Sequence, residues 1–501
     1  MIFMKQLVRG IMGKMENKAT TYSLCFIMFV VFCYYSLTYV NIIINPFVSE
    51  FREGHTFTPT YLLLKGIMPW SLETYPEYYN CYGIFFNFVV YPFALLFGNS
   101  FVLHRIINEV FLLMTVIEIV YYKLPKTIDI LRTFILLSLY ILINYSVNIT
   151  LRPDGLGTFL FTMSILIPLR GHYSGKALCM AAVLSILAFY TKPYFLLGWY
   201  IVSFISLLHN YKRCLKYNLF FHLLLFISLV AVFKLFPLYF YETMFSHEAY
   251  AGQVIDLSFS FIQFIAFLIK TSPLLLIGLT ISCKDNLSEN RDMVVMITLC
   301  AIPLFYPLGT NRGAFVTYHI QLMLPLISAY LLSCLEFKMQ RVPNLFILVA
   351  LIMLVSLNRC PSPGSICSSK DWKKVAEYIK ESNSILNSSL IAPLLISLDK
   401  QVVDNGATGV VFAYHPSFLT EFLFGMDKEV LAQKERYITE IKQNVENQSY
   451  DIILLTDSEK HLLQYVDVKK YEKTEELHLD VYDGRSSLHD YKMYVMKPIR
   501  N

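Results

Sequence analysis

The residues best suited to chemistry lie directly after the first long apolar run of the chain, 21–44. Within a few positions the sequence places Glu50, Arg52, Glu53 and His55. A carboxylate at a membrane surface is able to accept a proton from a hydroxyl group, which is general-base catalysis. The alternative is a solvated turn in which Arg52 pairs with a neighbouring acid. The residues alone leave that choice open.

Four basic residues fall at the ends of apolar runs, on the face where these acids are expected. They are Arg105, Arg152, Lys192 and Arg312. Such side chains hold a phosphate by charge-assisted hydrogen bonds. Arg105 has a structural alternative in an ion pair with Glu109, one helical turn away. Arg152 has one in Asp154, and Lys192 has one in a side chain that extends toward the lipid headgroups.

Aromatic and histidine side chains accompany these charges. Tyr318 and His319 either line a pocket or satisfy backbone groups at a helix end, and the second interpretation is the simpler one. The tyrosines of segment 75–82 either anchor the chain at headgroup level or stack on a sugar. The expected pocket residues are Arg52, His55, Asp154, Tyr318 and His319.

The composition requires a membrane around these residues. Of 501 residues, 55% are hydrophobic and 16% are charged, and the mean hydropathy is +0.50. These values exclude a soluble fold. The net charge of +5 is scattered in short clusters, which excludes nucleic acid as a partner. We find no nucleotide-binding loop and no spacing of metal ligands, so we expect no cofactor and no metal.

Apolar runs predict about eleven transmembrane helices, each near the ~20 residues that cross a bilayer. The predicted spans are 21–44, 101–122, 128–147, 155–169, 177–190, 194–208, 219–241, 259–282, 293–308, 315–335 and 345–357. Every second loop is basic, which places the N-terminus in the cytoplasm. The first loop, 45–100, and everything after 358 then lie outside. Because the N-terminal run lacks a small-residue cleavage site, we interpret it as an anchor.

The run 83–98 is too short for a comfortable span, and a crossing there would invert every later basic loop. We therefore expect it to be an interfacial helix of the first outer loop, which is our name for residues 45–100.

The polar composition of 359–501 predicts a small soluble α/β domain beyond the transmembrane domain, 1–358. Its expected elements are helices at 372–380 and 428–447 and strands at 389–396, 452–456 and 493–496. Cys360 and Cys367 flank a Pro/Ser/Gly loop, and whether they form a disulfide stays open.

The order of several short motifs resembles the glycosyltransferase C superfamily, and more closely the family of protein mannosyltransferases and bacterial lipid A aminoarabinose transferases. The motifs are Arg52-Glu53-Gly54-His55, Lys65-Gly66, the aromatic segment 75–82, Leu96-Phe97-Gly98-Asn99-Ser100, Arg105, Arg152-Pro153-Asp154, Thr191-Lys192-Pro193, Arg312, Tyr318-His319 and Leu324-Pro325. The resemblance implies a polyprenyl-phosphate sugar donor and an acidic catalytic base in the first outer loop. The family's Asp-Glu pair stands here as Arg52-Glu53, so Glu53 is the expected base and Glu50 the reserve.

The sequence therefore predicts an α-helical polytopic membrane glycosyltransferase of a bacterial cytoplasmic membrane, with its C-terminal domain in the periplasm. The resemblance implies an inverting, metal-independent reaction. The acceptor, a glycan, lipid or protein, stays open. A transporter or lipid flippase is the alternative, although we see neither repeated halves nor matching broken helices. A polysaccharide ligase or polymerase of the cell envelope is a further alternative.

Overall fold

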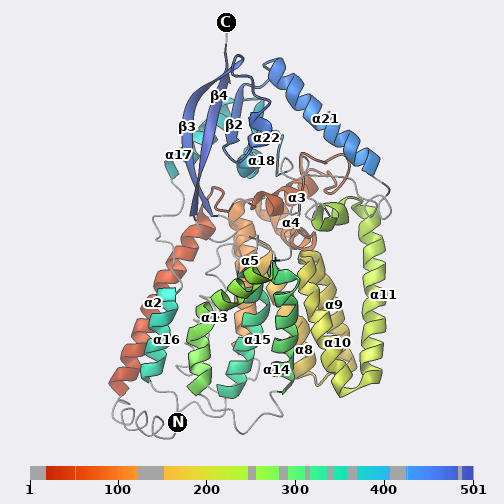
Figure 1. Cartoon of the computed structure of the whole chain (residues 1–501), viewed down its shortest axis with the longest axis vertical. Helices are drawn as coiled ribbons and strands as arrows, with labels where there is room; N and C mark the ends of the chain where they lie inside the picture. Colours follow the sequence, from red (N-terminus) through yellow and green to blue (C-terminus); the bar gives the residue numbers. More distant parts are fainter. Residues whose placement is uncertain are drawn as a thin grey trace.

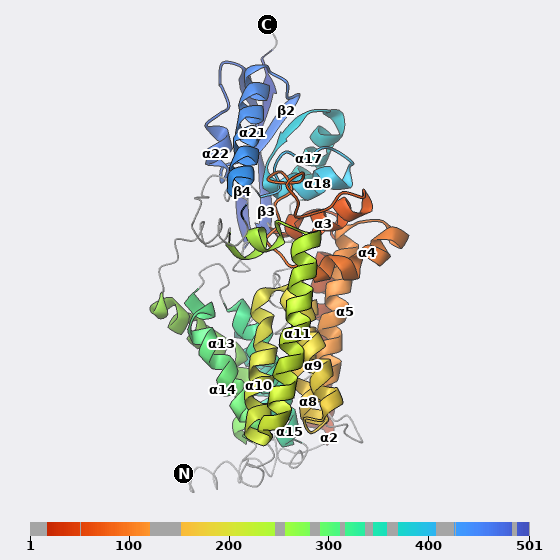
Figure 2. The ribbon, with the colours of Figure 1, turned by 90° about the vertical axis from the view of Figure 1, so that its right-hand side faces the viewer.

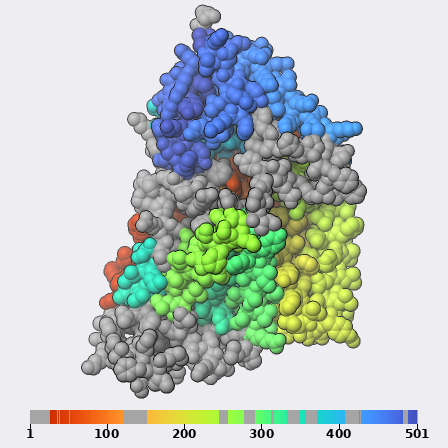
Figure 3. All heavy atoms as spheres, viewed as in Figure 1, coloured from red at the N-terminus to blue at the C-terminus, as the bar shows by residue number. Residues whose placement is uncertain are grey.

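The computed structural model describes residues 18–50, 52–120, 152–245, 256–280, 291–310, 316–335, 344–357, 369–406, 425, 427–482 and 488–499. A bundle of long helices forms one half of the molecule, and a small sheet with its own helices caps one end of the bundle (Figures 1 and 2). The space-filling view shows the same division, with the blue C-terminal domain above the helices (Figure 3).

Within the described residues, every predicted span coincides with a helix of the bundle. These helices are α2 (Lys18–Ile44), α5 (Phe101–Val120), α8 (Asp154–Arg170), α9 (Gly175–Thr191), α10 (Leu197–His209), α11 (Tyr211–Leu235), α13 (Leu257–Thr280), α14 (Arg291–Phe305), α15 (Thr317–Leu335) and α16 (Asn344–Leu357). The predicted span 128–147 lies outside the described residues. Three helices, at Phe26–Ile44, Tyr211–Leu235 and Leu257–Leu276, have by themselves the length and hydropathy to cross a bilayer.

The bundle separates residues that face lipid from residues that face protein. Only 6% of the apolar stretch of α11 is buried, and this helix runs along the edge of the bundle (Figure 1). At the centre of the bundle, α8 and α9 carry fully buried residues, which are Phe161 and Ile165 of α8 and Ala181 and Ala182 of α9. Small residues at this position let two helix backbones approach closely, which is how helices associate in a membrane.

The first outer loop contributes two short helices between the bundle and the sheet, α3 (Gly54–Leu64) and α4 (Phe85–Phe97) (Figure 2). The helix expected at 83–98 is confirmed as α4. Its last residues, Leu96 and Phe97, are 76% and 74% exposed although both are strongly apolar. Exposed apolar side chains at the end of a short helix suit the membrane interface.

The C-terminal domain is built on a four-stranded sheet in the order β1-β2-β4-β3. Its elements are α17 (Ser369–Glu381), β1 (Ile385–Asn387), α18 (Ala392–Ser397), α21 (Asp427–Glu446), β2 (Ile452–Thr456), α22 (Lys460–Leu463), β3 (Tyr471–Tyr482) and β4 (Leu488–Pro498). β1 and β2 are parallel, and the other neighbours are antiparallel.

One expectation for this domain is wrong. The run 389–396 was expected to be a strand but forms a 3-10 turn followed by α18. A short buried apolar run does not distinguish helix from strand, and Pro393 near its start suits the first turn of a helix. β1 and β3 were not predicted, whereas the expected strands 452–456 and 493–496 are confirmed as β2 and part of β4. The expected helices 372–380 and 428–447 are confirmed as α17 and α21. Cys360 and Cys367 lie outside the described residues.

The C-terminal domain and the first outer loop share a hydrophobic core. Phe47 stacks on Trp372 of α17, with ring centroids 5.9 Å apart. Phe57 belongs to the same buried cluster as Trp372. The amide of Asn405 donates to Tyr79 O at 3.2 Å, and Thr58 Oγ1 donates to Asn405 Oδ1 at 3.0 Å. The domain is therefore packed on the loop that carries the candidate acids.

Candidate active site

Arg105, on α5, holds the first outer loop against the bundle. Its Nε donates to Glu53 Oε1 at 2.6 Å and its Nη2 donates to Glu53 Oε2 at 2.9 Å. Further N–H groups donate to the carbonyl oxygens of Ile42, Asn45 and Phe47 at 2.9, 2.6 and 2.8 Å. The side chain of Arg105 is 1% exposed. The Glu53–Arg105 pair thus fastens the turn that follows α2.

Glu53 is engaged on both of its oxygens. Besides the guanidinium, Oε2 accepts the backbone N–H of Ser49 at 2.8 Å and that of Glu50 at 3.4 Å. The N–H groups of Arg105 donate to the first outer loop. They do not form the ion pair with Glu109 that the sequence offered as an alternative. A guanidinium whose donors point at carbonyl and carboxylate oxygens has little to offer a phosphate. This geometry therefore favours a structural role for Glu53 and Arg105.

Four other candidates form two buried ion pairs. Glu50 pairs with Arg152, which stands just before α8, and Asp154 at the start of α8 pairs with Lys192 at the end of α9. All four side chains are buried. The backbone N–H of Arg52 donates to Glu50 Oε2 at 2.9 Å. We call Glu50, Arg52, Arg152, Asp154 and Lys192 the charged cluster.

These two ion pairs differ from the structural alternatives that the sequence suggested for Arg152 and Lys192. Arg152 pairs with Glu50, which is 102 residues away, and not with Asp154 two residues on. Lys192 does not extend toward the headgroups, because its ammonium is buried against Asp154. Charges of both signs thus alternate within one buried region, where each interaction is stronger than in water.

Tyrosines and one amide enclose the charged cluster. The ammonium of Lys192 lies 4.5 Å from the ring centroid of Tyr82 and 6.0 Å from that of Tyr194. The rings of Tyr194 and Tyr318 are 4.5 Å apart. The hydroxyl of Tyr194 donates to Gln321 Oε1 and, at 3.4 Å, to Asp154 Oδ1. The rings of Tyr82 and Tyr194 thus place the ammonium of Lys192 beside aromatic groups, which stabilises its charge.

Local sequence explains why these residues meet. Pro153 is the residue that precedes α8, and Asp154 in the first turn suits the positive end of the helix dipole. Pro193 follows Lys192 and ends α9, so Lys192 is extended at the helix end. Gly83 lets the first outer loop touch that end, because a Cβ there would lie 2.1 Å from Tyr190 O.

Several polar atoms of this region are buried without a hydrogen-bond partner among the described residues. They are Tyr82 Oη, Arg152 Nε, Asp154 Oδ2 and Gln321 Nε2. A buried polar group is normally satisfied, so such atoms mark a place built for a polar ligand or for water. They include donors and an acceptor, which suits a ligand that carries an anion and hydroxyl groups.

The positive charge of the cluster extends to the first outer loop. Burial raises the pKa of the Cys81 thiol to about 11, and the charges of Arg52, Lys192 and Arg152 oppose that rise. Cys81 and Tyr82 therefore lie within the electrostatic reach of three cations. Their combined field favours an anion beside segment 80–83.

Three predicted site residues are not members of the charged cluster, because they lie beside it, elsewhere in the bundle or outside the described residues. His319 is fully buried in α15 and packs on Phe267, with ring centroids 5.7 Å apart. His55 borders the region, since its ring lies edge-on to Tyr82 with centroids 6.0 Å apart, and its Nδ1 lies 3.2 Å from Tyr79 O. Arg312 lies outside the described residues.

Sequence reasoning missed Tyr194 and Gln321 as site residues. Gln321 had a usable signal, because it is a polar residue in an apolar helix and lies three positions after Tyr318, on the same helix face. Tyr194 follows the Lys192-Pro193 motif and is an aromatic residue like many others in this chain. Its role is visible only once α8 and α15 are in place.

Two solved structures are similar to this chain over most of its length. One is the crystal structure of ArnT from Cupriavidus metallidurans bound to undecaprenyl phosphate, with a TM-score of 0.55, 10% identity, and coverage of 94% of this chain and 97% of that one. The other is the same protein in the apo state, with a TM-score of 0.38, 10% identity and coverage of 93% and 97%. No protein-family model and no curated protein sequence matches this chain. The first of these matches shows that the chain has the fold of ArnT, which agrees with the resemblance seen in its sequence.

Proposed function

We propose that this protein is a membrane glycosyltransferase that transfers a sugar from a polyprenyl-phosphate donor to a hydroxyl acceptor. The observation that carries the proposal is the charged cluster, which the first outer loop forms with the ends of α8 and α9 in a chain with the fold of ArnT. ArnT was crystallised with undecaprenyl phosphate, a lipid of the class that we assign as donor carrier. Buried ionisable groups inside a membrane protein point to function by default.

The cations of the cluster hold the donor phosphate. Arg152 has an unpartnered Nε among the described residues, and Lys192 and Arg52 add two further charges. In the reaction the bond between sugar C1 and the phosphate oxygen breaks, and the oxygen leaves with the electron pair as polyprenyl phosphate. This anion is a weak base and needs no proton, only positive charge around it.

Glu50 is the proposed base. The acceptor oxygen forms the new bond to C1, and its proton passes to Glu50. Glu50 replaces Glu53 in this role because Glu53 is tied to Arg105, whereas Glu50 belongs to the charged cluster. A carboxylate has about four lone-pair positions, so Glu50 keeps acceptor capacity beside Arg152 and the N–H of Arg52.

The test compares donor binding with transfer in purified full-length protein. Lys192→Met should weaken retention of undecaprenyl phosphate, because it removes a charge that the phosphate needs. Glu50→Gln should leave that retention intact and lower transfer by about 100- to 10,000-fold, the usual contribution of a general base. Asp154→Asn tests the other acid of the charged cluster in the same way.

Three results would contradict parts of this proposal. Unchanged retention in the Lys192→Met variant would remove the lysine from the phosphate site. If Asp154→Asn abolished transfer while Glu50→Gln kept it, the base would be Asp154, whose Oδ2 is unpartnered among the described residues. Movement of the lipid across the membrane without a glycoside product would favour the transporter alternative.

A further inference from the structure

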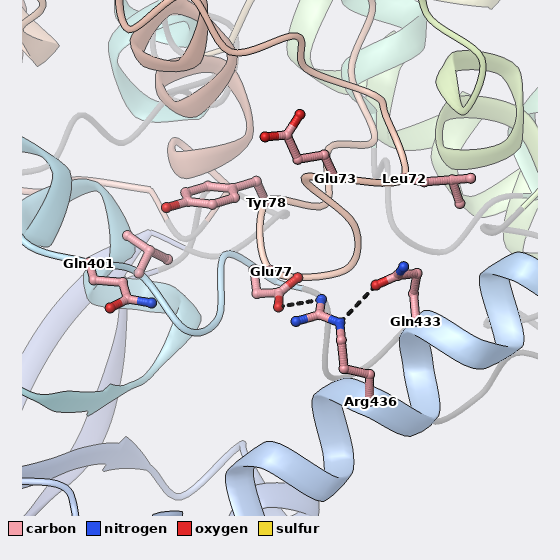
Figure 4. Close-up of a pocket in the computed structure, with 8 residues that line it drawn as sticks. Leu72, Glu73, Glu77, Tyr78, Gln401, Gln433 and Arg436 are labelled. Atoms are coloured by element: carbon pink, nitrogen blue, oxygen red, sulfur yellow. Dashed lines mark hydrogen bonds and ion pairs between the residues drawn. The ribbon is translucent and has the colours of Figure 1, made fainter.

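A second polar region lies where the first outer loop meets the C-terminal domain. A pocket of about 400 Å³ opens there between two segments far apart in the sequence (Figure 4). Its walls are Leu72, Glu73, Glu77 and Tyr78 of the loop and Gln401, Val402, Gln433 and Arg436 of the domain. We call it the junction pocket. Its volume suits a small ligand or one end of a larger one.

The walls of the junction pocket are suited to hydroxyl groups. Arg436 donates to Glu77 Oε1 at 2.7 Å and to Gln433 Oε1 at 2.7 Å, so these three side chains hold each other in place (Figure 4). Glu77 Oε2 is buried without a hydrogen-bond partner among the described residues. A ligand does not reach this buried oxygen, and the side chains that it meets first are the exposed Glu73 and Gln401. The amides of Gln401 and Gln433 offer donors as well as acceptors, and a hydroxyl group uses both.

Charge limits the class of ligand further. The polar walls carry two carboxylates, Glu73 and Glu77, against one guanidinium, Arg436, which is already paired. Phosphate or carboxylate ligands are repelled by such a surface. Tyr78 adds an aromatic wall, and rings of this kind pack on the C–H face of a sugar. A neutral glycan fits both properties.

The junction pocket and the charged cluster are connected by one stretch of chain. Four residues after Tyr78 comes Tyr82, whose ring contacts Lys192. Four residues span at most about 14 Å even when fully extended. The stretch between them is fixed, since Asn80 N donates to Glu242 Oε2 at 2.8 Å and Asn405 N donates to Glu77 O at 3.0 Å. A ligand in the junction pocket is therefore held near the proposed catalytic site.

We propose that the junction pocket binds the acceptor, and that this acceptor is a neutral, hydroxyl-rich glycan. The inference rests on the proposed function, because it assigns the second substrate of the same reaction. One sugar unit sits between the first outer loop and α21, and the growing end of the glycan extends to the charged cluster. The C-terminal domain thereby supplies one wall of the acceptor site.

The test uses the full-length protein in detergent on an array of defined oligosaccharides, in neutral, amino-sugar and phosphorylated forms, with serine and threonine peptides on the same surface. The wild-type protein should be retained by neutral oligosaccharides. The double variant Glu73→Ala, Gln401→Ala should bind them about tenfold less for each hydrogen bond lost. Both side chains are exposed, so their replacement leaves the core intact.

Glu435→Ala is the control, because Glu435 is exposed on α21, the helix that carries Gln433 and Arg436, and does not line the pocket. It should bind like the wild type. Retention only by phosphorylated sugars or by peptides, or equal retention of the double variant, would overturn the proposal. Undecaprenyl phosphate binding is measured in parallel. Its absence in the wild-type protein would defeat the proposed function, whereas its presence without glycan binding would defeat the acceptor site alone.

Discussion

Three buried ion pairs lie at the start of the first outer loop, Glu53–Arg105, Glu50–Arg152 and Asp154–Lys192, yet Glu50 and Glu53 have different surroundings. Glu53 is fixed by two bonds to one guanidinium and by backbone N–H groups. Glu50 shares its region with a second ion pair and with unpartnered polar atoms among the described residues. The surroundings of Glu53 stabilise a turn, whereas those of Glu50 have the composition of a binding site.

Paired substitutions separate these roles. Glu53→Gln should lower the free energy of unfolding by about 3–5 kcal/mol, because it leaves the charge of Arg105 buried and unpaired. The double variant Glu53→Gln, Arg105→Gln should regain part of that loss and keep transfer activity. The double variant Glu50→Gln, Arg152→Gln should regain stability in the same way but remain inactive. Thermal unfolding in detergent and transfer per folded molecule are the two measurements.

Equal transfer activity of the two double variants would contradict a structural role for Glu53 and a catalytic role for Glu50. A Glu53 double variant that is stable and inactive would return the catalytic role to Glu53. The comparison is a double-mutant cycle, which isolates the interaction of a pair from the effect of each substitution.

For single residues, the sequence identified the charged side chains of the site better than it identified their ion-pair partners. Glu50, Arg152, Asp154 and Lys192 were all singled out, because ionisable residues at the ends of apolar runs are rare enough to be noticed. Their pairing was not predictable. Glu50 and Arg152 are 102 residues apart, so the choice between them and nearer partners depends on how α5, α8 and α9 pack.

At the scale of elements, the approach of the first outer loop to α9 depends on Gly83. A Cβ at this position would lie 2.1 Å from Tyr190 O and 2.5 Å from Thr191 O, both of which are backbone atoms. Gly83→Ala should therefore push Tyr82 away from Lys192. We expect a loss of about 1–3 kcal/mol of stability, as in other overpacked sites, and a large loss of transfer.

Gly175→Ala is the control for this prediction. Gly175 is the first residue of α9, and a Cβ there meets no atom within 4 Å. That variant should keep its unfolding temperature and its activity. If Gly83→Ala behaved like the control, the contact between the loop and the helix end would not position the site.

In the C-terminal domain, a buried acid lies where the parallel strands end. Glu459 Oε1 accepts from Ser388 Oγ and Ser389 N, each at 2.7 Å, and Oε2 accepts from Thr456 N at 3.0 Å. Burial, and then the charge of Asp404, raise the pKa of Glu459 from 4.5 to about 7. Between pH 4.5 and about 7, Glu459 therefore keeps its proton in the folded domain and loses it in the unfolded chain.

This shift predicts how stability depends on pH. Below pH 4.5 both states hold the proton and the stabilisation is complete, and it is lost as the pH rises through about 7. The loss amounts to about 3 kcal/mol, from 1.36 kcal/mol per pKa unit. The unfolding temperature should fall between pH 5 and pH 8, and Glu459→Gln should flatten that decline. An unchanged slope in the variant would assign the pH dependence to other groups.

Elements differed in how well the sequence predicted them, for a physical reason. The bilayer requires long apolar runs, so the described helices of the bundle coincide with predicted spans. In the C-terminal domain, α17 and α21 show one polar and one apolar face, and both were found. β3 alternates polar and apolar residues from 476 to 481 beside β4, and this strand signal in the sequence was missed.

The whole molecule has two ends that differ in chemistry. The junction of α10 and α11 lies at one end of the bundle, and the C-terminal domain caps the other (Figure 2). The charged cluster is built from the first outer loop and from the ends of α8 and α9, and this loop packs on the C-terminal domain. Donor and acceptor sites should therefore share the compartment of the C-terminal domain.

Cysteine labelling tests which compartment that is. Basic residues such as Lys212 and Arg213 at the α10–α11 junction predict that this end faces the cytoplasm. In a background without the ten native cysteines, Glu440→Cys on the exposed face of α21 should react with an impermeant maleimide in intact cells. Lys212→Cys should react only after lysis, which also shows that the position is accessible. The reverse pattern would place the charged cluster on the cytoplasmic side, and the sugar would then be transferred before its lipid carrier crosses the membrane.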